Sequence, residues 1–125
     1  MSESPEDFVR LTDQSLNDIE EMVGTGVSVR PLYSTLYYAV FYSVKAILLD
    51  RGFTPKTHRG TASQFYQEIY SKEDIFQKEE AILIQRLQEK RDMADYELEI
   101  NFDRKDFEKD YSKAKKVIEK IKSEI

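Results

Sequence analysis

The stretch from residue 31 to residue 49 constrains the fold most, because Lys45 is its only charged residue. Its length and apolarity would also suit a membrane span. However, it contains many hydroxyl side chains: Tyr33, Ser34, Thr35, Tyr37, Tyr38, Tyr42 and Ser43. Hydrocarbon offers no partners for so many hydroxyls. We therefore predict a buried helix from near Pro31 to about Asp50, around which the rest of the chain packs.

Length and composition bound the architecture. With 125 residues, the chain has room for one domain with a single core, spanning residues 1–125. Charged residues make up 34%, and there are only four glycines and three prolines, which favours long helices over strands and turns. We predict an all-α fold, an antiparallel bundle of about four to five helices.

The first and last helices have clear signals. Ser4 can cap a helix that starts at Pro5 and ends at Gly24. Its predicted inward face comprises Phe8, Leu11, Ser15, Ile19 and Met22. A final helix is predicted to start after Asp103 and to run to the C-terminus. Its apolar positions recur by threes and fours, at Phe107, Tyr111, Ala114, Ile118, Ile121 and Ile125.

The middle of the chain has two further cap signals. Thr61 and Gln64 fit a capping box that would open a short helix ending near Tyr70. The residues from Ser71 to Asp74 offer another cap, for a long helix reaching about Tyr96. The second helix should stop at Arg51-Gly52, so a loop at 51–60 is expected before the third.

Composition also excludes several function classes. The net charge of -5 and a pI near 5.0 argue against a protein that wraps DNA. There is no cysteine and His58 is the only histidine, so thiol chemistry and zinc sites with two imidazoles are excluded. We predict no metal and no cofactor. The acidic N-terminus is unlike a signal peptide, so we expect a cytoplasmic protein that does not bind membranes.

Arg91 lies where the apolar pattern of its helix calls for an apolar residue. The inward stripe runs through Leu83, Ile84 and Leu87 to Arg91, and Asp95 follows one turn later. A charge on a core stripe is costly unless it is paired or borders a cavity. Two interpretations remain open: an ordinary salt bridge between Arg91 and Asp95, or an arginine held by Asp95 and aimed into a polar pocket beside Tyr96.

The loop at 51–60 carries the lone histidine among basic residues. Lys56, His58 and Arg59 at the start of a helix would suit a phosphate or another anion. The alternative is that His58 only braces the third helix. Likewise, the tyrosines of the apolar helix could stack on nucleic-acid bases or simply fill the core.

These motifs together resemble the HEPN family, small all-helical domains associated with nucleotide binding. The resemblance covers nearly the whole chain and rests on the runs at 37–41 and 45–49, on the Lys-Thr-His58 loop and on the segment Arg91-Asp-Met-Ala-Asp95-Tyr96. It implies an all-α HEPN-like bundle. Catalytic members carry an arginine that contacts phosphate and, a few residues later, a histidine that helps activate the RNA 2′-hydroxyl. Arg91 resembles that arginine, and Asp95 stands close to where the histidine would be.

The resemblance implies two functions. One is a nucleotide- or RNA-binding module, acting as a metal-independent ribonuclease in a toxin–antitoxin or defence pair. Its catalytic residues would be His58 and Arg91, with Arg51, Lys56, Arg59, Asp95 and Tyr96 binding phosphate or nucleotide. The other is a non-catalytic homodimer that partners a nucleotidyltransferase antitoxin. Aspartate lacks the imidazole's proton-donating form near neutral pH, which keeps binding without cleavage open.

Overall fold

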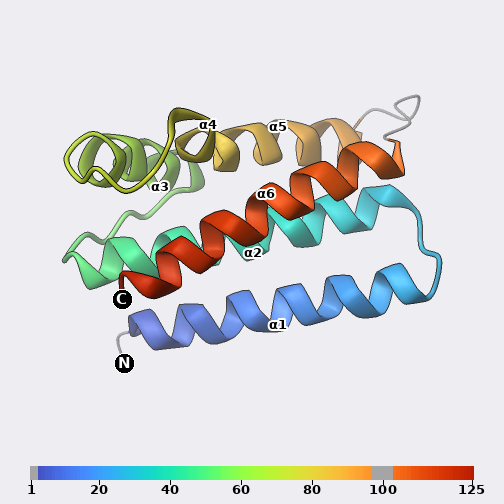
Figure 1. Ribbon diagram of the computed structural model, residues 1–125, viewed down its shortest axis with the longest axis horizontal. Coiled ribbons are helices and arrows are strands. Elements are labelled where there is room, and N and C mark those ends of the chain that lie inside the picture. Colours follow the sequence, from blue (N-terminus) through green and yellow to red (C-terminus); the bar gives the residue numbers. More distant parts are fainter. Residues whose placement is uncertain (1–2, 97–102) are drawn as a thin grey trace.

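The computed structural model describes residues 3–96 and 103–125, and the side chains of residues 94–96 lie outside this description. Within those ranges the chain is helical and contains no strand, so the all-α prediction is confirmed. Its longest helix is α2 (Val29–Asp50), which packs against α1 (Pro5–Gly24) on one side and against α5 (Leu83–Tyr96) and α6 (Arg104–Ser123) on the other. Figure 1 shows α2 between α1 and the remaining helices.

The apolar side chains of α2 lie mainly in the core of the bundle. The helix is long and apolar enough to cross a membrane, but 67% of its most apolar window is buried inside the bundle. The hydroxyl of Ser43 donates to the Val40 carbonyl, 2.7 Å away, so this buried polar group is satisfied within the helix. α2 is thus the core helix of the bundle, as predicted. The helix ends at Asp50, and Gly52, with a φ of 90°, follows the C-cap and lets the Phe53 amide reach back to the Leu48 carbonyl.

α1 has the predicted ends but a shifted inward face. Ser4 and Asp7 form a reciprocal capping box at its start. Leu11, predicted to face inward, is 38% exposed, and Thr12 is buried instead. The Thr12 hydroxyl hydrogen-bonds the Phe8 carbonyl within α1 and the Ala39 carbonyl of α2. The small side chain of Ala39 lets the two backbones approach there, which favours a short polar residue over leucine.

α6 begins where predicted, because Asp103 accepts a hydrogen bond from the Lys105 amide. Its buried face contains an acid that the apolar pattern did not indicate. Asp110 is buried, accepts a hydrogen bond from the Tyr33 hydroxyl at 2.8 Å and pairs with Lys90 and Arg86 of α5. This network joins α2, α5 and α6. By contrast, the predicted stripe residue Ile125 is 37% exposed.

The start of the third helix differs from the prediction. The N-cap of α3 (His58–Gln64) is Thr57, whose side chain accepts from the Gly60 amide, and not Thr61. Thr61 is fully buried and donates its hydroxyl to the Thr57 carbonyl. His58 therefore stands in the first turn of a helix and not in a loop. A π-helical segment, η1 (Phe65–Tyr70), follows without a break.

The fourth helix begins later than predicted and is divided. Gln77, not Ser71, caps the short α4 (Lys78–Ala81) through a reciprocal bond with Glu80, and α5 follows. Phe76 explains the delay: its buried ring packs edge-on against Phe65 of η1, with centroids 5.3 Å apart. The chain has to turn back at that point to place Phe76 in the core.

Candidate functional site

Three helices meet at a group of aromatic and basic side chains, which we call the aromatic–basic cluster. It consists of Tyr37, Tyr38 and Phe41 from α2, His58 from α3 and Arg91 from α5. Residues four apart share one helix face, so Tyr37 and Phe41 lie one turn apart on α2 and present a continuous aromatic surface. His58, in the first turn of α3, and Arg91 of α5 pack onto that surface.

His58 is held on two sides. Its ring stacks on Phe41 with centroids 4.2 Å apart and planes inclined by 11°. Its Nδ1 forms a 2.6 Å hydrogen bond with the Tyr37 hydroxyl. The Tyr38 ring meets the imidazole edge-on, 6.0 Å between centroids. Packing and a hydrogen bond together fix the ring orientation, which a catalytic or ligand-binding histidine requires.

Arg91 lies against the same two tyrosines. Its guanidinium carbon is 5.1 Å from the Tyr37 ring centroid and 5.2 Å from that of Tyr38, within the range of cation–π attraction. The side chain is half-buried. His58 and Arg91, which are far apart in the sequence, therefore both contact Tyr37 and Tyr38. An arginine on an apolar stripe is accommodated here by aromatic faces.

The electrostatics of the cluster favour a neutral imidazole. Burial lowers the pKa of His58 below its usual 6.5, and the positive charges of Arg91 and Lys45 lower it further. Burial raises the pKa of Tyr37 to about 12, although Arg91 opposes that change. At neutral pH the cluster thus holds a neutral base, a protonated phenol and a permanent cation.

Only one tautomer of His58 makes Nε2 a proton acceptor. A neutral imidazole carries one proton, so Nε2 is basic when Nδ1 bears the hydrogen and donates it to the Tyr37 oxygen. In the other tautomer Tyr37 donates to Nδ1, and Nε2–H can donate to a phosphate oxygen. Because a hydroxyl both donates and accepts, Tyr37 supports either state.

We expect His58 to make the protein less stable in mild acid. The pKa of His58 is lowered in the folded state. Above the unfolded pKa of about 6.5, the imidazole is neutral in both the folded and the unfolded protein, so His58 does not reduce the free energy of unfolding. As the pH falls below that value, the unfolded chain takes up the proton more readily, and stability is lost until the folded pKa is passed. Urea unfolding at pH 7.5 and 5.5 should show a larger loss for the wild type than for His58→Gln. Equal losses in both proteins would contradict the lowered pKa.

Lys45 belongs to the surroundings of the cluster. Its ammonium lies 5.9 Å from the Phe41 ring centroid and donates to the Pro55 carbonyl at 3.1 Å. This bond ties the 51–57 loop to α2 just before His58. Phe41 and Lys45 were not among the predicted site residues, and Tyr37 was considered only as one of the tyrosines that could stack on bases. Tyr37, Phe41 and Lys45 are spaced by four residues, and Lys45 is the only charged residue between 31 and 49. This spacing is the sequence signal that could have identified them.

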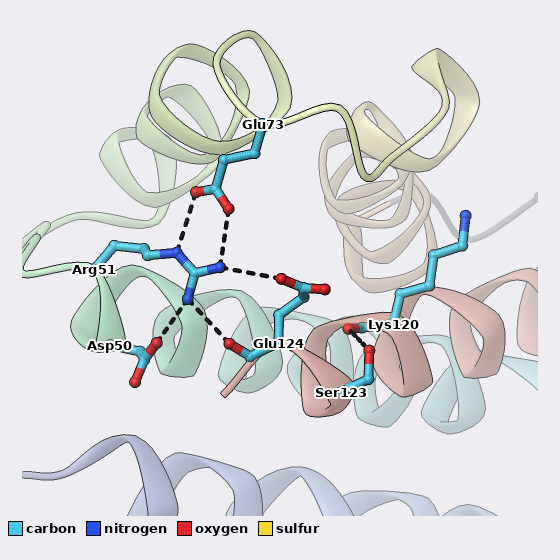
Figure 2. Close-up of polar contacts among 6 residues, drawn as sticks. All are labelled: Asp50, Arg51, Glu73, Lys120, Ser123 and Glu124. Carbon is cyan, nitrogen blue, oxygen red and sulfur yellow. Dashed lines mark hydrogen bonds and ion pairs between the residues drawn. The ribbon is translucent and has the colours of Figure 1, made fainter.

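Arg51, predicted to bind phosphate, is surrounded by acidic groups (Figure 2). Its guanidinium binds both carboxylate oxygens of Glu73 at 2.9 and 3.1 Å, and it also pairs with Asp50 and Glu124. A further bond reaches the Glu124 backbone carbonyl at 3.0 Å. Arg51 thus connects the end of α2 to the turn after η1 and to the end of α6. We therefore leave it out of the proposed site.

Replacing Arg51 with alanine is expected to destabilise the fold by about 1–3 kcal/mol, because several partly buried charge-assisted bonds are lost together. Arg51→Lys should recover little of that loss, since lysine cannot bind Glu73 through two nitrogens. Urea unfolding of both variants measures the effect. A loss of only a few tenths of a kcal/mol, typical of an exposed pair, would show that the network contributes little.

The other predicted site residues are placed differently. Lys56 and Arg59 flank His58 in the chain, and both are exposed. The side chains of Asp95 and Tyr96 lie outside the described residues, although both positions belong to α5. Across the part of the chain that the structure describes, no three acidic or histidine side chains gather as a metal centre would need. The binding roles of all these residues stay predictions.

A family model of the HEPN domain matches residues 6–124, nearly the entire chain. The chain belongs to the HEPN family. Domains of this family are generally connected with nucleotides and RNA. A comparison with curated proteins found no match. Membership agrees with the helical bundle and makes the cluster around Arg91 the natural candidate for a site in this HEPN domain.

Proposed function

We propose that this HEPN domain binds single-stranded RNA at the aromatic–basic cluster and cleaves it without a metal ion. The observation that carries the proposal is the contact of both His58 and Arg91 with Tyr37 and Tyr38. A base and a permanent cation in one small site can serve a single phosphodiester. We further propose that the protein acts in the cytoplasm as the toxin-like component of a toxin–antitoxin or defence pair.

The cleavage step uses the two residues differently. Nε2 of His58 takes the proton from the ribose 2′-hydroxyl, and the 2′-oxygen attacks the adjacent phosphorus. The bond from phosphorus to the 5′-oxygen breaks, that oxygen takes a proton from water, and the His58 imidazolium gives its proton to the hydroxide that remains. The products are a 2′,3′-cyclic phosphate and a free 5′-hydroxyl. Arg91 stabilises the charge that develops on the non-bridging phosphate oxygens, while Lys56 and Arg59 bind neighbouring phosphates.

A lowered pKa suits His58 to the role of base, because the imidazole is then neutral and able to accept a proton near pH 7. The hydrogen bond from Nδ1 to the Tyr37 oxygen persists when the ring becomes an imidazolium, since Nδ1 donates in both states. Tyr37 therefore orients the base before and after proton transfer.

The test is cleavage of a labelled single-stranded RNA in the presence of EDTA. The wild type should produce fragments ending in 2′,3′-cyclic phosphate, and His58→Ala should produce none while keeping the helical circular dichroism spectrum. An RNA carrying 2′-deoxy sugars should bind but stay intact. Cleavage that requires magnesium or manganese, or that survives in His58→Ala, would refute the mechanism.

A second candidate function is favoured by Asp95, which stands close to where catalytic relatives of the family carry histidine. In this alternative the chain binds RNA or nucleotide without cleaving it, and it forms a homodimer that partners a nucleotidyltransferase. RNA binding that depends on Arg91, together with the absence of cleavage in the assay above, would support this candidate over the first.

Both candidate functions include a homodimer, in which two copies of the cluster face one cleft. Sedimentation velocity at micromolar protein concentration should therefore give twice the mass of the 14.7 kDa chain. The same experiment with Met93→Glu tests whether an exposed apolar residue of α5, two positions after Arg91 in the chain, contributes to the dimer interface. A wild type that sediments as a monomer would remove the shared cleft from the proposal.

A further inference from the structure

A groove of about 530 Å³ is lined by both polar and apolar side chains. One wall is a stripe along α3 and η1, and the other is a stripe along α4 and α5. The residues of the groove that the argument uses are Arg59, Ser63, Tyr66, Gln88, Glu89 and Asp92. On each wall these residues recur by threes and fours, so each wall is one helix face.

One end of the groove lies near the aromatic–basic cluster, although no residue of the cluster lines it. η1 packs against α4, which places the η1 part of one wall beside the start of the other. Arg59 and Asp92 therefore belong to the opposite end. Arg59 directly follows His58 in the chain, and Asp92 directly follows Arg91. Asp92 is also close enough to Tyr37 for its charge to raise the pKa of that phenol.

The chemistry of the groove differs from that of the cluster. Glu89 and Asp92 carry negative charges and Arg59 a positive one, so the groove does not favour a phosphate. Its carboxylates accept hydrogen bonds, and the Gln88 amide donates and accepts at once. These are the groups that recognise base edges, where a carboxylate pairs with the amino group of cytosine. Tyr66 is 38% exposed and offers a face for stacking.

We infer that this groove holds the base next to the phosphate bound at the cluster, and that its carboxylates favour bases with an exocyclic amino group over uracil. The inference rests on the proposed function, because the phosphate at His58 and Arg91 sets the position of the base.

The experiment compares short oligocytidylate with oligouridylate of equal length, both with 2′-fluoro sugars so that the attacking hydroxyl is absent. Fluorescence anisotropy gives the Kd of each. The wild type should bind the cytidine oligomer about tenfold more tightly, in line with one base-edge contact. The double variant Glu89→Gln/Asp92→Asn should bring the ratio of the two Kd values close to one. Its amide side chains donate hydrogen bonds as well as accept them, whereas the carboxylates only accept.

The matched control is Asp18→Asn/Glu21→Gln on α1, which removes the same two charges from exposed positions on the opposite side of α2. It should keep the wild-type ratio. The ratio of the two Kd values is the measured quantity, because a change in phosphate affinity changes both Kd values by the same factor.

A wild-type ratio near one, or a groove variant that keeps the wild-type ratio, would overturn the inference. The proposed function would still stand if Arg91→Ala weakened binding of both oligomers. Binding of neither oligomer would overturn both, leaving the groove to another occupant such as a peptide.

Discussion

Replacing Arg91 with alanine is expected to weaken RNA binding by about 1–3 kcal/mol, or about 5- to 150-fold in Kd. The guanidinium lies over Tyr37 and Tyr38 in a half-buried position, where water screens its charge less than at the surface. A phosphate bound beside it gains a charge-assisted contact that no neighbouring side chain replaces at the same point. The measurement is fluorescence anisotropy with a single-stranded RNA at fixed salt, because phosphate contacts depend on ionic strength.

Two variants sharpen the interpretation of that result. Arg10→Ala removes an exposed arginine from α1, where its partner is Asp7, and should leave the Kd within a factor of about two. Arg91→Lys keeps the charge but loses the planar group that lies against the rings, so it should bind with intermediate affinity. If Arg91→Ala and Arg10→Ala weaken binding equally, Arg91 contributes only general charge and the site lies elsewhere.

The parts of the fold that could be predicted are those set by local chemistry. α1 and α6 carry their own caps, Ser4 and Asp103, and the apolar stretch of α2 carries so many hydroxyl side chains that a buried helix was predicted for it. The starts of α3 and α4 were predicted at Thr61 and Ser71, and both predictions were wrong. Thr57 prevails over Thr61 because Thr61 is buried, and Gln77 prevails over Ser71 because Phe76 has to reach Phe65. Tertiary packing decided both cases.

The candidate site could likewise be predicted only in part. His58 and Arg91 could be singled out because one is the only histidine and the other interrupts an apolar stripe. Their common contact with Tyr37 depends on how three helices cross, which no local pattern encodes. Arg51 shows the converse, since its partners Glu73 and Glu124 are distant in sequence and only the fold brings these acids to it.

Phe41→Ala is expected to cost about 3–5 kcal/mol of unfolding free energy, through lost burial and the cavity that remains. The ring is 8% exposed, packs on Tyr37 and forms the surface on which His58 stacks. Leu48→Ala should cost about 2–5 kcal/mol for the same reason, because Leu48 is fully buried in the same helix. Urea unfolding monitored by circular dichroism measures both losses. A loss below about 1 kcal/mol in either variant would show that α2 is peripheral.

The two variants separate stability from function. At low temperature and without denaturant, where both proteins are still mostly folded, only Phe41→Ala removes a side chain that touches His58. We therefore expect Phe41→Ala to bind and cleave RNA poorly even in the folded fraction, and Leu48→Ala to retain wild-type activity per folded molecule. Equal activity of the two folded variants would mean that the stack on Phe41 does not position His58. The hydrogen bond between Nδ1 of His58 and the Tyr37 hydroxyl would then be what orients the ring, and Tyr37→Phe would be the variant that reduces cleavage.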